Sequence, residues 1–216
     1  MGAGPAGCLL ALSLLDAARS RRRLLSVSVY GARMHPRDAR PLVADADAVL
    51  RLGAAGLTVP AIPGAALRRI RCVIGRSEFE APSSLFVLPR AELVGGMRAS
   101  AMARGARLVP HPVDAITKGA DGSWTLRARG ASERAELVVL ACGTGASVAA
   151  SLPFHSPPPL WRSCLAELEV APAMEDQLDG SLYWLSGDGA LPHLLVAPSG
   201  RRAHALAMGP DVSAAE

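Results

Sequence analysis

The sequence has few aromatic residues and almost no lysine. Aromatic residues make up 4% of the 216 residues while hydrophobic residues make up 50%, so the core must consist mainly of Ala, Leu and Val. Lys118 is the only lysine, and the net charge of +4 therefore comes almost wholly from arginine. The one arginine run, at residues 21–23, has no aromatic residues interleaved with it. A solvated connection is favoured there over a nucleic-acid patch.

Paired cysteines and catalytic constellations are also lacking. Cys8, Cys72, Cys142 and Cys164 are far apart and form no C-x-x-C pair, which favours reduced thiols in a cytoplasmic protein over a disulfide frame or zinc site. No metal-ligand spacing and no Ser-His-Asp order is found, so we predict no metal and leave catalytic residues unknown. No stretch reaches the roughly 20 apolar residues of a membrane span.

A glycine-rich turn opens the sequence as G-x-G-x-x-G at residues 2–7, and an apolar helical stretch follows. Gly2 can take a tight turn, Gly4 lets the backbone approach a pyrophosphate, and Gly7 allows close packing of the helix. Pro5 suits a first helical turn, where its missing N–H costs nothing. Because free amides and the helix dipole attract phosphate, the motif predicts a dinucleotide site. The alternative for the motif alone is a small-residue entry into a helix.

The surroundings of the turn support the dinucleotide interpretation in one respect and depart from it in two. Residues 24–30 alternate as a strand, at the spacing of a βαβ unit. A buried strand should precede the turn, yet only Met1 stands before Gly2, so we expect the coding sequence to extend upstream, with a codon that can encode valine at Met1. The second strand should end in an acid that binds the ribose hydroxyls, and Gly31 occupies that place.

The remaining pattern divides into an α/β part and a strand-rich part. We expect helices at 45–52 and 89–105, and strands at 70–74, near Phe79, at 106–109, in a hairpin of 113–118 with 123–128, and at 136–141. The last of these is apolar enough to be a buried parallel strand. It leads into a second glycine-rich turn at 142–147, where open α/β sheets bind ligands.

A proline-rich connection at residues 151–160 marks the expected domain boundary. Beyond it, strands are expected at 163–170, 181–185, 191–197 and 202–208, the last three as an antiparallel meander. The predicted fold class is therefore α/β. It comprises a Rossmann-like dinucleotide-binding domain at residues 1–150, whose first strand is missing, and part of an antiparallel β substrate domain at residues 151–216.

With both glycine turns and the hairpin between them placed, the chain resembles the flavin monooxygenases of the para-hydroxybenzoate hydroxylase type. It is also similar to their relatives, the geranylgeranyl reductases and flavin-dependent halogenases, from Gly2 to about Gly209. The resemblance implies an FAD-binding first domain and a small organic substrate, and leaves NAD(P)H open as electron donor. The cofactor-binding residues that it implies are Gly2, Gly4, Pro5, Ala6, Gly7, Arg33, Arg90, Ala141 and Gly143.

Three positions differ from the family's pattern. Gly31 replaces a glutamate at the end of the second strand, Cys142 replaces the aspartate of an Asp-Gly motif, and Ala150 replaces the arginine that closes that motif. The family's later Gly-Asp segment would lie beyond residue 216. Two functions follow: an FAD-dependent oxidoreductase, or a truncated or degenerate relative that keeps the fold without binding FAD. A plain NAD(P)-binding enzyme explains the antiparallel second half poorly.

Overall fold

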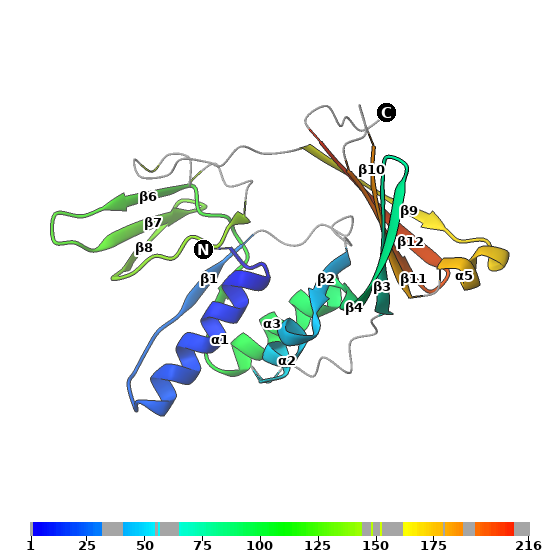
Figure 1. Ribbon diagram of the computed structural model, residues 1–216. Coiled ribbons are helices and arrows are strands. Elements are labelled where there is room, and N and C mark those ends of the chain that lie inside the picture. Colours follow the sequence, from blue (N-terminus) through cyan, green and yellow to red (C-terminus); the bar gives the residue numbers. More distant parts are fainter. Residues whose placement is uncertain are drawn as a thin grey trace. The chain divides into compact units, whose positions relative to one another are not determined.

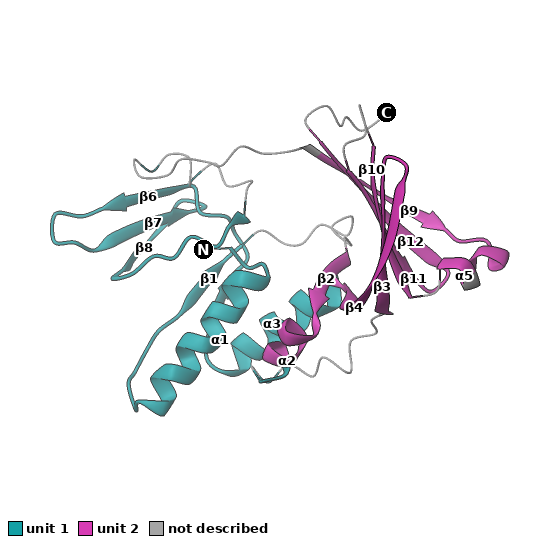
Figure 2. Cartoon of the chain, viewed as in Figure 1, with its two compact units in different colours: residues 1–38, 53–57, 91–158 teal, residues 39–52, 58–90, 159–216 magenta. Residues whose placement is uncertain are grey.

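The computed structural model describes residues 2–31, 41–54, 56, 65–143, 148, 152, 162–178, 180–187 and 193–209. The chain forms two compact units, shown in Figure 2: unit 1 contains residues 1–38, 53–57 and 91–158, and unit 2 contains residues 39–52, 58–90 and 159–216. The units alternate along the sequence, which the single predicted boundary at residues 150–151 does not describe. They alternate because strands from residues 41–89 pair with strands near the carboxyl end.

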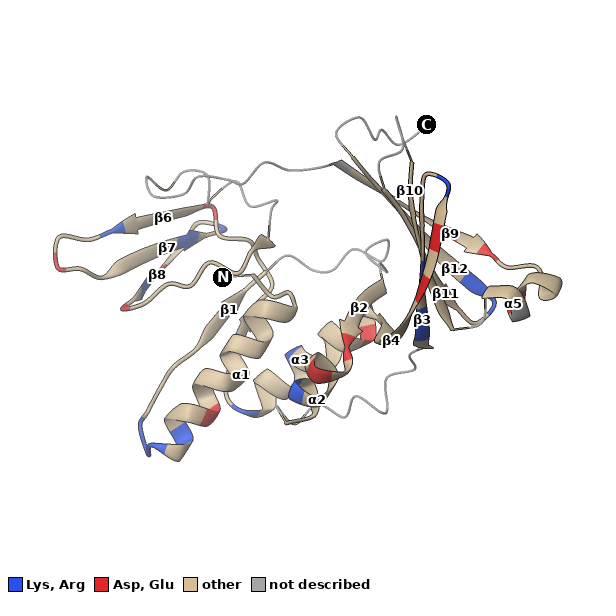
Figure 3. Ribbon diagram, in the orientation of Figure 1, with Lys and Arg blue, Asp and Glu red and all other residues tan. Residues whose placement is uncertain are grey.

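Unit 1 is built around the glycine turn and the helix that follows it, α1 (Pro5–Ser20) (Figure 1). Strand β1 (Ser28–Tyr30) pairs in parallel with β5 (Arg107–Val109). The arginine run after α1 is exposed, as predicted for a solvated connection, and forms a basic end to the helix in Figure 3. Strand β1 is shorter than the predicted 24–30, because residues 24–27 have no strand partner among the described residues.

Helix α3 (Arg90–Ala103) is followed by Arg104, which pairs with Asp16 of α1 at 3.3 Å, and the helix buries one face. Its buried residues Leu93, Val94, Met97 and Ala101 recur at helical spacing, as the sequence predicted. Gly105 ends the helix with a φ of +99°, a left-handed conformation that glycine adopts without steric cost. The chain then enters β5.

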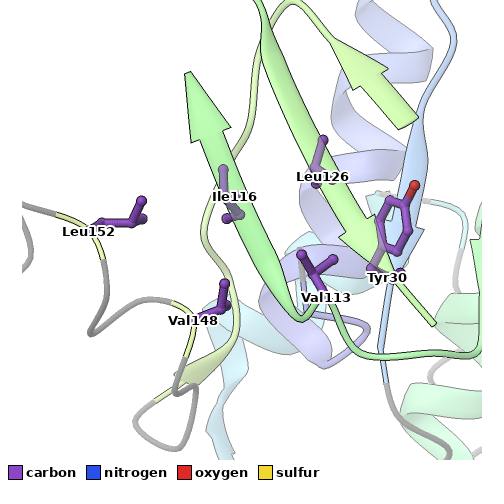
Figure 4. Packing of buried hydrophobic residues seen from close by; sticks show 7 residues of the cluster. Tyr30, Val113, Ile116, Leu126, Val148 and Leu152 are labelled. Carbon is purple, nitrogen blue, oxygen red and sulfur yellow. The ribbon is translucent and has the colours of Figure 1, made fainter. Parts of the chain in front are cut away.

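A three-stranded antiparallel sheet completes unit 1. The predicted hairpin is confirmed as β6 (Ala115–Lys118) and β7 (Trp124–Ala128), and β8 (Ala131–Ala135) adds a third strand that was not predicted. Figure 4 shows the hydrophobic cluster under this sheet, where Tyr30 packs with Val113, Ile116, Leu126 and Val148. The cluster is mainly aliphatic, as the composition requires.

The prediction of a parallel strand at residues 136–141 is wrong. The segment is not a strand, and the Leu137 side chain is 71% exposed. Its apolar sequence suits a buried strand, but strand structure also requires a neighbouring backbone to receive its hydrogen bonds. The described residues supply no such neighbouring strand, and a groove separates this segment from β1.

Unit 2 is a seven-stranded sheet in the order β2-β4-β3-β10-β11-β12-β9. All neighbours are antiparallel except β3 and β10, which are parallel. The strands are β2 (Pro41–Asp45), β3 (Ala65–Ile74), β4 (Ser77–Pro89), β9 (Arg162–Glu169), β10 (Ser181–Ser186), β11 (His193–Ser199) and β12 (Arg202–Gly209).

The meander prediction is confirmed for β10, β11 and β12. The strands predicted at 70–74 and near Phe79 form a hairpin that is much longer than expected, turned at Gly75 with a φ of +59°. Figure 3 shows basic residues on β3 beside acidic residues on β4, where Glu80 pairs with Arg69 at 3.3 Å and Arg71 at 2.9 Å. Strand β2 was not predicted.

Two short helices accompany the unit 2 strands. The expected helix at residues 45–52 is present as α2 (Ala46–Ala54), with the Asp45 carboxylate accepting a 2.6 Å bond from the Ala48 N–H. Helix α5 (Pro172–Leu178), between β9 and β10, was not predicted. None of the described helices is long and apolar enough to cross a membrane.

Candidate functional site

Backbone contacts at Gly2 and Gly7 leave no room for side chains at these two positions of the glycine turn. Gly2 has a φ of +97°, and its N–H donates to the Tyr30 carbonyl at 2.7 Å. A Cβ at Gly2 would meet the backbone of residues 141–142, with the Cys142 nitrogen at 2.8 Å. A Cβ at Gly7 would lie 3.0 Å from the Gly2 carbonyl carbon and closer still to its oxygen. Both positions therefore require glycine, whatever the turn binds.

The amino end of α1 is open where the turn enters it. Gly4 is the N-cap residue and supplies no side-chain cap, Pro5 follows it, and the first turn contains no acidic residue. A Cβ at Gly4 would meet nothing within 4 Å, and Ala6 is exposed. The N–H groups of Ala6 and Gly7 and the positive end of the helix dipole are thus free of side-chain competition. This arrangement fits a phosphate group.

Arg98 of α3 stabilises the turn from the other side. Its Nε donates to the Ala3 carbonyl at 3.0 Å, and the buried Cys8 thiol donates to the same oxygen at 3.6 Å. Burial raises the pKa of Cys8, and the nearby Arg98 guanidinium only partly opposes this. Cys8 is therefore a protonated packing residue rather than a nucleophile. Arg98 was not predicted as a site residue, although its helical spacing from the buried Val94 and Ala101 places it beside the buried face of α3.

Gly31 lies directly against the turn at the end of β1. A Cβ there would approach the Ala3 nitrogen at 2.8 Å and the Ala3 Cβ at 2.5 Å. The Gly31 N–H donates to the Val109 carbonyl at 3.1 Å, which fixes its backbone to β5. Glycine at this place is therefore a packing requirement of this chain.

The structure places the first residues of the second predicted glycine-rich turn against Gly2 of the first, while residues 144–147 lie outside the described residues. The carbonyl of the half-buried Ala141 lies against Gly2, and Gly143 follows with a φ of +66° and open space where its Cβ would be. Arg33 and Ala150 lie outside the described residues. Arg90 begins α3 within unit 2, whereas the glycine turn belongs to unit 1. Its place along a flavin stays a prediction.

A polar cluster that was not predicted from the sequence links β1, β5 and β8. The Tyr30 hydroxyl donates to the Glu133 carboxylate, which also pairs with Arg107, and Arg107 donates to the Ser28 hydroxyl at 3.0 Å. Burial, with the Glu133 hydrogen bond, raises the pKa of Tyr30 to about 12. The Tyr30 hydrogen bond lowers the pKa of Glu133, assisted by Arg107. At neutral pH the pair is therefore locked as phenol and carboxylate, which suits a structural link rather than proton transfer.

Metal-binding geometry is absent from the part of the chain that the structure describes, where no three His, Cys, Asp or Glu side chains gather. All four cysteines are free thiols.

Comparisons with known proteins define the fold class. No family model matches the sequence, and no curated protein matches it. Solved structures do match, and they show that the chain has the fold of FAD-dependent monooxygenases and flavin-dependent halogenases. This confirms the resemblance inferred from the sequence at the level of the fold.

Three of these structures illustrate the likeness. The p-nitrophenol 4-monooxygenase PnpA from Pseudomonas putida DLL-E4 has a TM-score of 0.74 at 16% identity, over 99% of this chain and 57% of that one. BrvH, a flavin-dependent halogenase from Brevundimonas sp. BAL3, has a TM-score of 0.76 at 15% identity, over 99% and 56%. PqsL from Pseudomonas aeruginosa, described as a probable FAD-dependent monooxygenase, has a TM-score of 0.70 at 17% identity, over 97% of this chain and 59% of that one. The chain thus spans somewhat more than half the length of each.

Proposed function

We propose that this chain binds FAD and is part of an FAD-dependent oxidoreductase acting on a small organic molecule. The observation that supports the proposal most directly is the open amino end of α1, where Gly4 leaves room and no side chain caps the helix. The likeness to flavin enzymes supplies the class of ligand. A reductase, a monooxygenase and a halogenase all remain compatible with it, and NAD(P)H is one candidate electron donor.

The residues of the turn have distinct proposed roles. The N–H groups of Ala6 and Gly7 would bind the diphosphate, and Gly4 would let it approach the backbone. Arg98 holds the Ala3 carbonyl in its own hydrogen bond, so that this oxygen does not compete with or repel an anion at the turn. The remaining guanidinium charge of Arg98 adds positive potential there.

The chemistry itself would belong to the flavin, which when bound supplies an acceptor and donor of electrons. The protein's part is to hold the cofactor, orient the substrate and exclude water. We propose the unit 2 sheet as the substrate domain, and Arg33, Arg90, Ala141 and Gly143 as further cofactor-binding residues. We also keep a cytoplasmic location as a proposal, in line with the four free thiols.

A second candidate is a degenerate relative that keeps the fold without holding FAD. Gly31 favours it, because this position has no acid and the Ala3 backbone leaves no room for one. The two candidates differ in one measurable property, which is flavin binding.

The test is flavin retention by the purified full chain after mixing with FAD and desalting, read from the visible flavin absorbance. Arg98→Met should weaken retention about tenfold or more, because it removes a charged donor from the turn. Arg19→Met is the control, since Arg19 is an exposed arginine in the last turn of α1, at the opposite end of that helix from the glycine turn. Retention by the wild type and the control, with loss in Arg98→Met, supports the proposal. No retention by the wild type would establish the second candidate.

A further inference from the structure

The carboxyl end of α1 leads into three arginines and two leucines at residues 21–25, which we call the basic turn. All five side chains are exposed, and Leu24 and Leu25 are 105% and 46% exposed. The three guanidinium groups have no ion pair or hydrogen-bond partner among the described residues. Figure 3 shows this end of α1 as a basic tip of unit 1.

The backbone of the basic turn is fixed by the hydrogen bonds that end α1. The Arg22 N–H donates to the Arg19 carbonyl at 3.0 Å, and the Arg23 N–H donates to the Ala18 carbonyl at 2.8 Å. These two bonds form a Schellman motif, in which one residue takes the left-handed conformation. That residue is Arg22, with a φ of +51°. Glycine takes this conformation without steric cost, so arginine at this place lowers the stability of the turn.

The fold itself does not require the arginines of the basic turn. A cation is favoured at the negative end of a helix dipole, but the effect falls off within the last turn, where Arg19 already lies. Asp16 is the only acidic residue before Asp38 in the sequence, and it pairs with Arg104 at 3.3 Å. The basic turn therefore keeps three unpaired charges and one strained residue on the surface, which indicates a role in binding.

Leu24 discriminates between the anionic partners that three arginines attract. Arginine binds the phosphates of lipids and of nucleic acids equally well, through paired N–H donors. A fully exposed leucine has no apolar partner along a nucleic-acid backbone, and the basic turn has no aromatic side chain to stack on bases. At a lipid surface, the leucine can enter the apolar layer while the arginines stay at the head groups.

We infer that the basic turn is a peripheral membrane site that binds the surface of a bilayer containing anionic phospholipids. Its three arginines bind the lipid phosphates, and Leu24 inserts below the head groups. Each arginine near such a surface raises the partition coefficient about fivefold, and three raise it about a hundredfold. The association is therefore reversible and depends on salt. This inference does not depend on the proposed function, because it involves no flavin and no residue of the glycine turn.

The test is cosedimentation of the full chain with extruded vesicles, without FAD. One set of vesicles is phosphatidylcholine alone, and the other contains about one third phosphatidylserine, which supplies the negative surface potential. The chain should sediment with the phosphatidylserine vesicles at about 0.1 M salt. It should be released at about 0.5 M salt, because the ions screen the arginines. It should not sediment with phosphatidylcholine alone.

Two single substitutions separate binding from folding. Arg22→Gly should lower the partition coefficient about fivefold while it raises the urea midpoint, because glycine relieves the left-handed strain. Loss of binding in this variant cannot then result from unfolding. Leu24→Gln replaces a fully exposed side chain, so it should leave the urea midpoint unchanged, yet it should lower the partition coefficient about fivefold or more.

A matched triple variant separates the basic turn from net charge. Replacing the three arginines of the turn by glutamine should lower the partition coefficient about a hundredfold. The control replaces Arg68, Arg76 and Arg127 by glutamine, since all three are exposed and the change in charge is the same; it should bind as the wild type does. No binding by the wild type, equal binding to both vesicles, equal loss in the two triple variants, or no effect of Leu24→Gln would overturn the inference. Tighter binding to a short DNA duplex than to the vesicles would also overturn it.

Discussion

Replacing Gly7 by alanine should destabilise the protein, although the same change elsewhere in a helix stabilises it. Glycine inside a helix costs about 0.5–1 kcal/mol relative to alanine, because the unfolded chain loses more conformational freedom. Gly95 in α3 shows this ordinary case, since it is exposed and a Cβ there would meet nothing within 4 Å. Gly95→Ala should therefore raise the free energy of unfolding by about that amount.

At Gly7 the added methyl group meets backbone instead of space. It would lie 3.0 Å from the Gly2 carbonyl carbon and nearer to the oxygen, and Gly2 is itself fixed by its bond to Tyr30. The turn must move, at a cost of about 1–3 kcal/mol for overpacking. When the stabilisation expected for Gly95→Ala is added to this cost, the free energies of unfolding of the two variants should differ by about 1.5–4 kcal/mol, measured by urea unfolding at 25 °C. Equal stabilisation by both substitutions would show that the turn is not packed as described.

Three further predictions concern neighbouring groups. Gly31→Glu introduces the acid that the resemblance leads us to expect at this position, yet it should weaken flavin retention and lower the urea midpoint, because its Cβ displaces Ala3. Tighter retention would contradict this packing. Tyr30 should titrate in ultraviolet absorbance near its raised pKa of about 12. Its contribution to the free energy of unfolding is therefore full below pH 10 and is lost as the pH rises toward 12. Glu133→Gln should lower the pKa of Tyr30, and a wild-type pKa near 10 would refute the buried hydrogen bond. Cys8 should resist alkylation at pH 8 while the half-buried Cys164 reacts, because burial raises the pKa of Cys8. Equal labelling of the two cysteines in mass spectrometry would contradict this prediction.

Local patterns predicted the elements whose signals are local. The glycine turn with α1, the helix ended by Gly105, the β6–β7 hairpin and the β10–β12 meander all follow from periodicity and turn residues. Strand β8 was missed. It follows β7 through a two-residue turn at Arg129 and Gly130, both of which have positive φ, as such hairpin turns require. Its sequence is polar, so hydrophobic alternation gave no signal.

Features that depend on distant partners could not be predicted in this way. The apolar segment at 136–141 has the composition of a buried strand, but its state depends on whether another backbone lies beside it. The interleaving of the two units depends on β3 pairing with β10 across more than a hundred residues. Strand β2 was missed for the same reason, since its five residues are a strand only through pairing with β4.

In the candidate site too, residues with a local signal were predicted and residues that depend on distant contacts were not. Gly2, Gly4 and Gly7 were identified because each has a backbone requirement that the motif encodes. Arg98 was not identified, because its hydrogen bond to Ala3 joins residues 95 positions apart. The packing role of Gly31 was also hidden, since a missing side chain gives no indication of what lies against it.

Competition binding with ADP and riboflavin tests the central claim most directly, because that claim concerns a diphosphate held by the amides of the α1 amino end. ADP carries the diphosphate without the flavin ring, and riboflavin carries the ring without any phosphate. The account predicts that FAD binds the full chain, that ADP displaces it, and that riboflavin at the same concentration does not. Displacement of FAD by riboflavin but not by ADP, or no binding of FAD or ADP at all, would contradict it.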